Sequence, residues 1–301
     1  RRPVLLSLNS SERYVIGVDL GTTNTVVAIG NLKGEILDEI KEPTVRNHRL
    51  KNVINFINDM VTEIIKRNNI KNEVIEGLGI SEAGIVEKSS GEIIFSPNFN
   101  WENVNVAKIL EKRTNLPTIA DNCTRVMAEG EIQYGCGQEV DNIFYVNIGY
   151  GIGSALVING KVFDNHSEFG HIPITDNSVR CSCGKFGCLE AVASGNAIER
   201  KANKIFKSEN NGWISAKDVA EWAKQGNEKA INIYKEAGKY LGEGIATVTN
   251  VINPDKIIIG GGVSGAGSIL LNPIKKSFSK NTMEFIKSNI IKNHSYINSG
   301  R

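Results

Sequence analysis

Short apolar runs that favour β-structure open the chain. Residues 14–18 and 25–29 form two such runs, and residues 35–40 form a third after turn-forming residues at 31–34. Consecutive strands joined by tight turns pair antiparallel. The opening of the chain therefore predicts an antiparallel meander.

A helical periodicity follows these runs. Asn52 has a side chain that can cap a helix, and apolar residues then recur three and four positions apart. These apolar positions are Val53, Ile54, Ile57, Met60, Val61, Ile64 and Ile65. The spacing predicts an amphipathic helix with one buried face. Further on, residues 74–80 and 91–95 predict strands, and residues 106–112 predict a helix that ends before Pro117.

The second part of the chain repeats this organisation. The predicted strands cover residues 143–148, 155–158 and 256–259, and the predicted helices cover residues 122–134, 195–205, 215–224 and 227–251. Ser215 is expected to cap one of these helices, and Trp213 and Trp222 are expected to be packing residues. The alternation of strands and helices predicts an α/β fold of two related halves.

Length and charge narrow the class of protein. A chain of 301 residues is long enough for two domains, and its 35 basic and 33 acidic residues are spread throughout. This balance gives no sign of a nucleic-acid surface or a membrane patch. No apolar run approaches the roughly 18 residues that a membrane span needs, and the start has no secretory signal, so we expect a cytoplasmic protein.

Three glycine-rich turns follow predicted strands. They contain Asp19, Gly21, Thr22 and Thr23; Gly149, Gly151 and Gly153; and Gly260, Gly261 and Gly262. Glycines let the backbone approach phosphate oxygens, the threonines add donors, and Asp19 could orient a magnesium-bound water. A tight hairpin that needs positive φ also explains any single turn. Three in this order resemble the phosphate-one, phosphate-two and adenosine motifs of the sugar kinase, Hsp70 and actin superfamily, which implies a two-domain ribonuclease H-like/actin-like ATPase fold with a central cleft.

Three of the five cysteines lie within eight residues of one another. They are Cys181, Cys183 and Cys188, and His171 precedes them. Three thiolates and an imidazole form the closed tetrahedral ligand set of a structural zinc ion, and the intervening glycines allow tight turns. Buried free thiols are the alternative, whereas a disulfide would leave one cysteine over and need an oxidising compartment. We therefore predict that residues 171–188 hold one zinc ion.

The same segment carries a family resemblance. The pattern Cys-x-Cys-Gly-x-x-Gly-Cys-x-Glu ends at Glu190, and an upstream Glu-x-Gly-His begins at Glu168. Both resemble the ROK family of sugar kinases and sugar-responsive transcriptional repressors, and the resemblance runs nearly end to end. It implies that Glu168, His171, Glu190 and Asn98 contact sugar hydroxyls, for which carboxylates and amides are suited. For Asn98 an ordinary turn is the alternative, and nearby Trp101 is expected to pack in the core.

One position departs from the kinases of that family. They usually have Asn-Asp where this chain has Asn122-Cys123, and the aspartate is the general base on the sugar hydroxyl. Removing a general base costs about 10² to 10⁴ in rate, and a thiol with an unperturbed pKa of about 8.5 is mostly protonated at neutral pH. We expect Asn122 and Cys123 to contact sugar without catalysis and Asp121 to point elsewhere. An alignment shifted by one or two residues is the alternative.

The ends of the chain carry further expectations. Residues 1–12 resemble the linker that joins an amino-terminal winged helix-turn-helix to the sugar-binding body of ROK repressors, with an irregular tail as the alternative. We expect a first α/β domain at residues 13–121 and a second at residues 122–301, which includes the zinc loop and ends before the family's final helix. DNA would be bound only through a helix-turn-helix outside this chain.

Together these features favour the effector-binding body of a ROK-type transcriptional regulator. Such a protein is expected to be a homodimer or a dimer of dimers and to bind a monosaccharide between its two halves. An ATP-dependent sugar kinase is the alternative, in which the phosphate turns would hold ATP and Mg²⁺. A structural actin-like or chaperone-like ATPase shares the fold but has no need of the zinc loop.

Overall fold

A computed structural model describes residues 12–164, 167–176, 179–207 and 212–286 of the chain. The chain divides into two compact units, Arg1–Val126 and Met127–Arg301, which are described separately below. The boundary lies a few residues after the one proposed from the sequence, between Asp121 and Asn122. The proposed linker at residues 1–12 and the final residues 287–301 fall almost wholly outside the described part.

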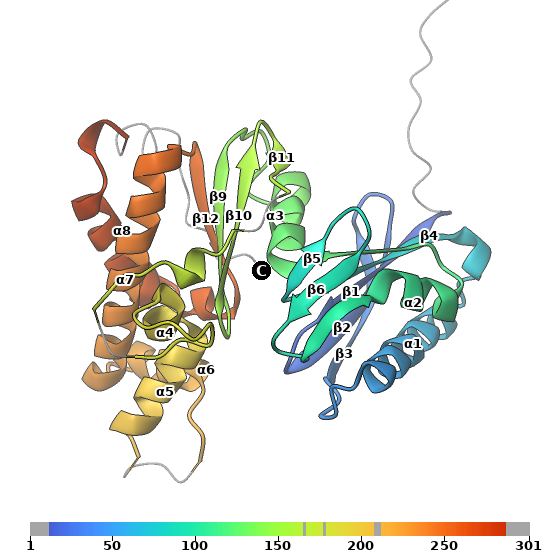
Figure 1. Ribbon diagram of the computed structural model, residues 1–301, viewed down its shortest axis with the longest axis horizontal. Coiled ribbons are helices and arrows are strands. Elements are labelled where there is room, and N and C mark those ends of the chain that lie inside the picture. Colours follow the sequence, from blue (N-terminus) through green and yellow to red (C-terminus); the bar gives the residue numbers. More distant parts are fainter. Residues whose placement is uncertain (1–11, 165–166, 177–178, 208–211, 287–301) are drawn as a thin grey trace, which may run out of the picture. The chain divides into compact units, whose positions relative to one another are not determined.

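The first unit is built on a five-stranded sheet in the order β3-β2-β1-β4-β8 (Figure 1). Its strands are β1 (Tyr14–Leu20), β2 (Asn24–Asn31), β3 (Ile36–Pro43), β4 (Ile75–Glu82) and β8 (Thr118–Asn122). The pairs β1–β2 and β2–β3 are antiparallel, which confirms the predicted meander. Strands β1, β4 and β8 are parallel, and their last residues Leu20, Glu82 and Asn122 are register neighbours at one edge.

Two helices, α1 (Leu50–Arg67) and α2 (Val106–Thr114), share a hydrophobic core with this sheet. Six of the seven apolar positions predicted for α1 are buried, namely Val53, Ile54, Ile57, Met60, Val61 and Ile64. The predicted cap is wrong: the helix begins at Leu50, so Asn52 lies inside the first turn and its N–H donates to Arg49 O at 2.9 Å. Periodicity located the buried face but not the first residue, which is common at helix ends.

A smaller antiparallel sheet, β5-β6-β7, completes the first unit. Its strands are β5 (Ile85–Glu87), β6 (Glu92–Ser96) and β7 (Trp101–Asn105), of which only β6 was predicted. Trp101 is buried, its ring centroid lies 4.9 Å from that of Phe99, and its Nε1 donates to His48 O at 2.9 Å. Trp101 is therefore a packing residue, as the sequence predicted.

The second unit repeats the strand arrangement of the first. Its sheet has the order β11-β10-β9-β12, with β9 (Ile143–Ile148), β10 (Ile152–Ile158), β11 (Lys161–Val162) and β12 (Lys256–Gly260). Each unit thus has a central strand with an antiparallel meander on one side and a parallel strand on the other. This repetition confirms the α/β fold of two related halves.

Alternate residues of β9 enter two different cores. Phe144, Val146 and Ile148 pack with helices α4 (Leu189–Ala193), α5 (Gly195–Ile205), α6 (Ala216–Lys224), α7 (Glu228–Ile252) and α8 (Ser268–Asn281). Ile143 and Tyr145 pack on the opposite face with Ala128 of α3 (Cys123–Tyr134). The period of two along a strand explains this division. Both faces of β9 are covered, which accounts for its run of buried residues from Ile143 to Val146.

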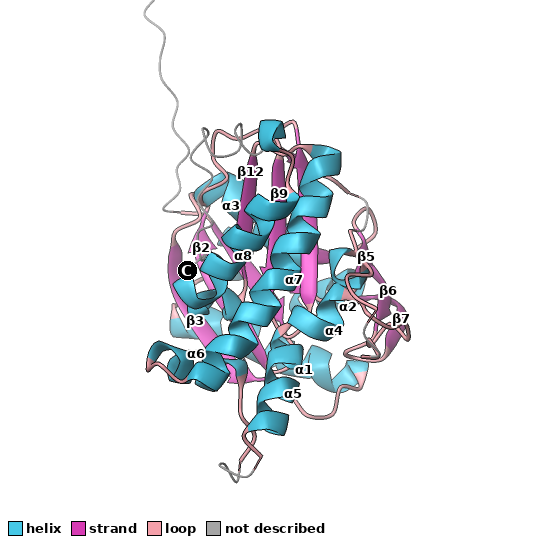
Figure 2. Cartoon of the chain, turned by 90° about the vertical axis from the view of Figure 1, so that its left-hand side faces the viewer, coloured by secondary structure: helices cyan, strands magenta, loops and turns pink. Residues whose placement is uncertain are grey.

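Helices α7 and α8 lie side by side in both views (Figures 1 and 2). Glycines allow this close approach, since a Cβ on Gly242 would stand 2.5 Å from Ile274 O. The predicted helix starts are good here, because Ser215 caps α6 through a capping box with Asp218. Trp222 packs against the core, but Trp213 is exposed and its Nε1 donates to Glu199 Oε2, so the packing prediction for Trp213 was wrong. No described helix combines the length and apolarity that crossing a membrane requires.

Candidate functional site

The cysteine-rich segment of the second unit folds into tight turns. The Cys181 N–H donates to Lys185 O at 2.8 Å, and the Gly184 N–H donates back to Cys181 O at 3.0 Å. Gly184 adopts φ +88° and Gly187 adopts φ +71°, a region in which other residues are strained. These turns bring Cys183 and Cys188 to the same side as Cys181, as the glycine spacing suggested.

Four donor atoms converge in this segment. The ligating atoms of His171, Cys181, Cys183 and Cys188 all lie within 4.8 Å of one another. Cys183 Sγ is 3.7 Å from Cys188 Sγ, and Cys181 Sγ is 3.5 Å from His171 Nδ1. Ligand atoms around a tetrahedral metal with bonds of about 2.0 to 2.3 Å stand roughly 3.5 to 3.8 Å apart. The set therefore fits a single tetrahedral metal ion, and all five cysteines are free of disulfides.

Two glutamates flank this metal-binding set in different ways. Glu168 is exposed and its Oε2 lies 3.8 Å from His171 Nε2, the ring nitrogen that faces away from Cys181. The carboxylate of Glu190 is occupied, because it accepts from Ser182 Oγ at 2.9 Å and from the Ile152 N–H at 3.0 Å. Glu168 is thus presented outward, whereas Glu190 ties the cysteine-rich turns to the start of β10.

The turn between β9 and β10 is shorter than the sequence predicted. Ile152 and Gly153 already belong to β10, so the turn consists of residues 149–151, closed by a 3.0 Å bond from Gly149 N to Gly151 O. None of its glycines adopts positive φ, so the hairpin explanation does not account for them. A Cβ on Gly151 would stand 2.5 Å from Glu190 Oε2, whereas a Cβ on Gly149 would meet open space.

The other two glycine turns also differ from each other. In the first unit, Gly21 closes the β1–β2 turn through Asn24 O and accepts from Thr44 Oγ1 at 2.6 Å, while Thr23 is exposed. In the second unit, Gly261 adopts φ +88° and a Cβ there would stand 2.5 Å from Ile148 O. Gly262 is different, because a Cβ there would have no neighbour within 4 Å. Internal packing therefore explains why position 261 is a glycine, but it does not explain the glycine at position 262.

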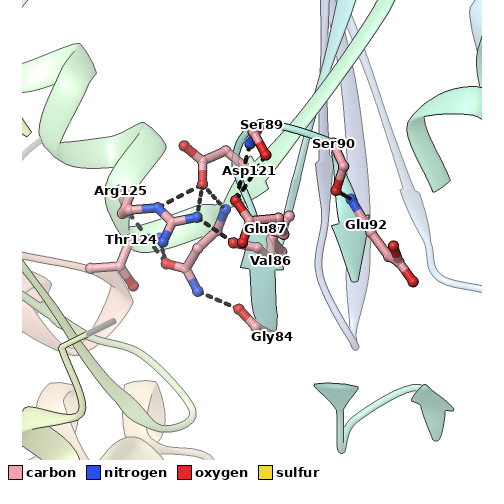
Figure 3. Close-up of polar contacts among 10 residues, drawn as sticks. Gly84, Val86, Glu87, Ser89, Ser90, Glu92, Asp121, Thr124 and Arg125 are labelled. Atoms are coloured by element: carbon pink, nitrogen blue, oxygen red, sulfur yellow. Dashed lines mark hydrogen bonds and ion pairs between the residues drawn. The ribbon is translucent and has the colours of Figure 1, made fainter. Parts of the chain in front are cut away.

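A third group of residues lies where the parallel strands of the first unit end. Asp121 accepts from Arg125 Nε at 2.6 Å and forms an ion pair with the buried guanidinium, whose Nη2 donates to Val86 O (Figure 3). Asn122 caps the next helix, since its Oδ1 accepts from Thr124 N at 2.8 Å, and its amide donates to Gly84 O. The Asp121 carboxylate is thus held by Arg125.

The Cys123 thiol holds its proton at physiological pH. Burial raises the pKa of its thiol to about 12, and the nearby Asp19 and Glu82 carboxylates add to the rise. A group with this pKa is protonated throughout the physiological range.

Asn98 is exposed in the turn between β6 and β7, and its backbone carbonyl lies 3.2 Å from His48 Nδ1.

Sequence reasoning missed Glu82 in this group. Glu82 is 1% exposed, and burial raises the pKa of its carboxyl to about 7 although a hydrogen bond from Ser96 opposes the rise. Its position two residues after the predicted strand at residues 74–80 was the available signal, because polar groups at the carboxyl ends of parallel strands often form ligand sites.

Comparison with known proteins assigns this arrangement to a family. The ROK family model matches residues 15–300. The chain belongs to the ROK family. Its fold is that of the sugar kinase and actin-like ATPases, as the glycine turns and the repeated sheets predicted.

Relatives of this ROK protein fall into two functional groups. It is 33% identical to a glucokinase of Halalkalibacterium halodurans, over 89% of this chain and 86% of that protein. It is 30% identical to a xylose repressor of Caldicellulosiruptor bescii, over 92% of this chain and 72% of that protein.

Solved structures show the same division. A ROK family transcriptional regulator, a homologue of the E. coli MLC protein, has a TM-score of 0.83 at 28% identity over 93% of this chain and 73% of that one. A ROK glucokinase from Streptomyces griseus in complex with glucose and AMPPNP has a TM-score of 0.80 at 29% identity, covering 89% of both chains. Overall similarity does not distinguish a regulator from a kinase.

Proposed function

We propose that this chain is the sugar-sensing, effector-binding part of a ROK-type transcriptional regulator. The observation that carries the proposal is the absence of an available base at the position where the family's kinases have aspartate. Cys123 has a thiol pKa of about 12 because it is buried, and the adjacent Asp121 carboxylate is held by Arg125. A general base needs a pKa near the working pH and access to the proton that it takes.

The proposed ligand is a monosaccharide. Sugar hydroxyls donate and accept hydrogen bonds. The amides of Asn98 and Asn122 offer matching groups in the first unit, and the outward carboxylate of Glu168 offers one in the second unit. Within the second unit, His171 and Glu190 would join Glu168, with Glu190 using the lone pairs that Ser182 and Ile152 leave free. Binding would shift the equilibrium between a DNA-binding state and a released state by the difference in its affinity for the two. DNA contact would come from a helix-turn-helix outside this chain, in a homodimer or a dimer of dimers.

We also propose that the ion held by the four ligands is zinc and that its role is structural. Three sulfurs and one imidazole nitrogen are the donors that zinc prefers, and four protein ligands leave no open position for a substrate. Within the second unit, the bound ion would fix Cys181 and His171 and thereby hold Glu190 and Glu168 in place. Glu168 beside His171 Nε2 would orient the imidazole as a carboxylate partner commonly does.

Calorimetry and a coupled phosphorylation assay test the regulator proposal. Titrating hexoses, pentoses and N-acetylhexosamines should give binding of at least one sugar, and the same sugars with ATP and Mg²⁺ should give no phosphorylation. Cys123→Asp restores the family's carboxylate and should raise any trace phosphotransfer by about 10² or more. Cys123→Asn is the matched control of similar size without a base. Robust phosphorylation by the unaltered protein would overturn the proposal, as would the absence of sugar binding at millimolar concentrations.

An ATP-dependent sugar kinase is the second candidate. It is favoured by the 33% identity to a glucokinase and by the open space beside Gly149 and Gly262, where a phosphate or nucleotide could approach the backbone. Asp19, whose Oδ1 accepts from Ser81 Oγ at 2.8 Å, would then stand near bound Mg²⁺. The coupled assay with the unaltered protein decides between the two.

A further inference from the structure

Glu82 occupies a position at which ligand sites form. It is the last residue of β4 and is paired in register with Leu20, the last residue of β1, and with Asn122, the last residue of β8. The carboxyl ends of parallel strands expose backbone and side-chain groups that the sheet does not use, so ligands of α/β proteins bind there. Two residues implied in sugar binding, Asn122 and Cys123, lie at this same edge.

Only half of the Glu82 carboxylate has a partner. Oε1 accepts from Ser96 Oγ at 2.5 Å, but no hydrogen-bond donor reaches the buried Oε2 among the residues that the structure describes. Oε2 is directed against the backbone of Gly84, where an added Cβ would stand 2.5 Å from it. A buried oxygen of this kind costs stability unless something hydrogen-bonds to it, so it marks a site with a ligand or a function.

The charged surroundings of Glu82 offer it no compensation. The carboxylates of Glu82 and of Asp19 from β1 both act on Cys123 of α3, since each raises the pKa of the Cys123 thiol. The cation at this edge, Arg125, is engaged by Asp121 and by Val86 O. Ser96, from β6, is neutral. Within the described part of the chain, the Glu82 carboxylate therefore accepts from the Ser96 hydroxyl at Oε1 and from no donor at Oε2.

We propose that Glu82 is a sugar-binding residue of this protein, whose Oε2 accepts a hydrogen bond from a ligand hydroxyl at the edge where position 123 lacks a carboxylate. This inference rests on the proposed function, because it requires a polyol ligand. The cluster of Glu82, Ser96, Asn122 and Gly84 is formed entirely within the first unit. A hydroxyl donor would satisfy Oε2 of Glu82, which is the one buried carboxylate oxygen without a hydrogen-bond partner among the residues that the structure describes.

This role has a definite pH signature. A hydroxyl that donates to Oε2 requires the ionised carboxylate, and the pKa of Glu82 in the free protein is raised by burial to about 7. Sugar binding should therefore release a proton below this pKa, and affinity should rise with pH. With one site of this pKa, binding at pH 6 should be about tenfold weaker than at pH 8. A protonated Glu82 that donated to the sugar would give the opposite slope.

Calorimetric titration of the whole chain with the sugar that binds best, at pH 6, 7 and 8, tests the inference. Buffers of different ionisation enthalpy measure the proton release. Glu82→Gln should weaken binding about tenfold at pH 8 and remove both the pH dependence and the proton release. Ser96→Ala removes the donor that favours the ionised form and should shift the pH profile upward. Glu87→Gln, at an exposed carboxylate in the same unit, is the control and should behave like the unaltered protein.

The outcomes separate this inference from the proposed function. If the unaltered protein binds no sugar, the proposed function and this inference both fall. If it binds sugar but Glu82→Gln leaves the affinity and its pH dependence unchanged, only the role of Glu82 is overturned. Tighter binding at pH 6 than at pH 8 would also overturn it. Circular dichroism at each pH shows whether the variants are folded.

Discussion

Burial of Glu82 should make the stability of the first unit depend on pH in a way that one substitution removes. The carboxyl has an ordinary pKa of 4.5, and burial raises this pKa to about 7 in the folded chain. The folded state therefore binds this proton more tightly than the unfolded state does. One pKa unit corresponds to about 1.4 kcal/mol, so keeping Glu82 ionised in the folded protein costs about 3 kcal/mol. Proton binding by the folded chain therefore stabilises it relative to the unfolded chain. This added stability is fully present below pH 4.5 and is lost as the pH rises through about 7.

Glu82→Gln has no such proton, and any effect of its amide is the same at every pH. The free energy of unfolding of the variant minus that of the unaltered chain should therefore increase by about 3 kcal/mol between pH 4.5 and pH 8.5, because only the unaltered chain loses stability over this range. Urea unfolding followed by tryptophan fluorescence measures this difference. Because the chain has three tryptophans, Trp213→Phe and Trp222→Phe in both proteins leave Trp101 as the reporter of the first unit. A difference that stays constant across this range would refute the assignment of a desolvated carboxylate, and Glu87→Gln should show no change.

Other predictions test the remaining structural conclusions. Cys188→Ser should lower the metal content, measured by atomic emission, and should lower the thermal midpoint. Cys136 is a free cysteine in the turn after α3 and lies outside the ligand set, so Cys136→Ser should retain the metal. Equal metal content in the two variants would exclude the four-ligand site. Arg125→Met leaves the Asp121 carboxylate without its partner and should lower the free energy of unfolding of the chain by about 3 to 5 kcal/mol, measured by urea unfolding. A loss below about 1 kcal/mol would instead mean that water replaces the ion pair. Gly261→Ala, at φ +88°, should cost more than about 1 kcal/mol, whereas Gly262→Ala, which has free space, should cost less in the same assay.

The sequence by itself determined the features that depend on local spacing. The three- and four-residue recurrence from Val53 to Ile64 specified the buried face of α1, because a helix places those positions on one side. The short apolar runs specified the opening meander, and the spacing of Cys181, Cys183 and Cys188 specified which donors converge. In each case the residues that matter are close in sequence, so elementary geometry relates them directly.

Tertiary structure decided what each polar group can do. Nothing near Glu190 in the sequence shows that its carboxylate accepts from Ile152, 38 positions away. Asp121 is engaged by Arg125, whose guanidinium is also bound by the Val86 carbonyl on β5, 39 positions away in the sequence. Glu82 looked like an ordinary polar residue after a strand until Ser96 and the Gly84 backbone enclosed it. The pKa of a carboxyl depends on the water removed and on the partners supplied by distant segments, and the order of residues along the chain does not record either.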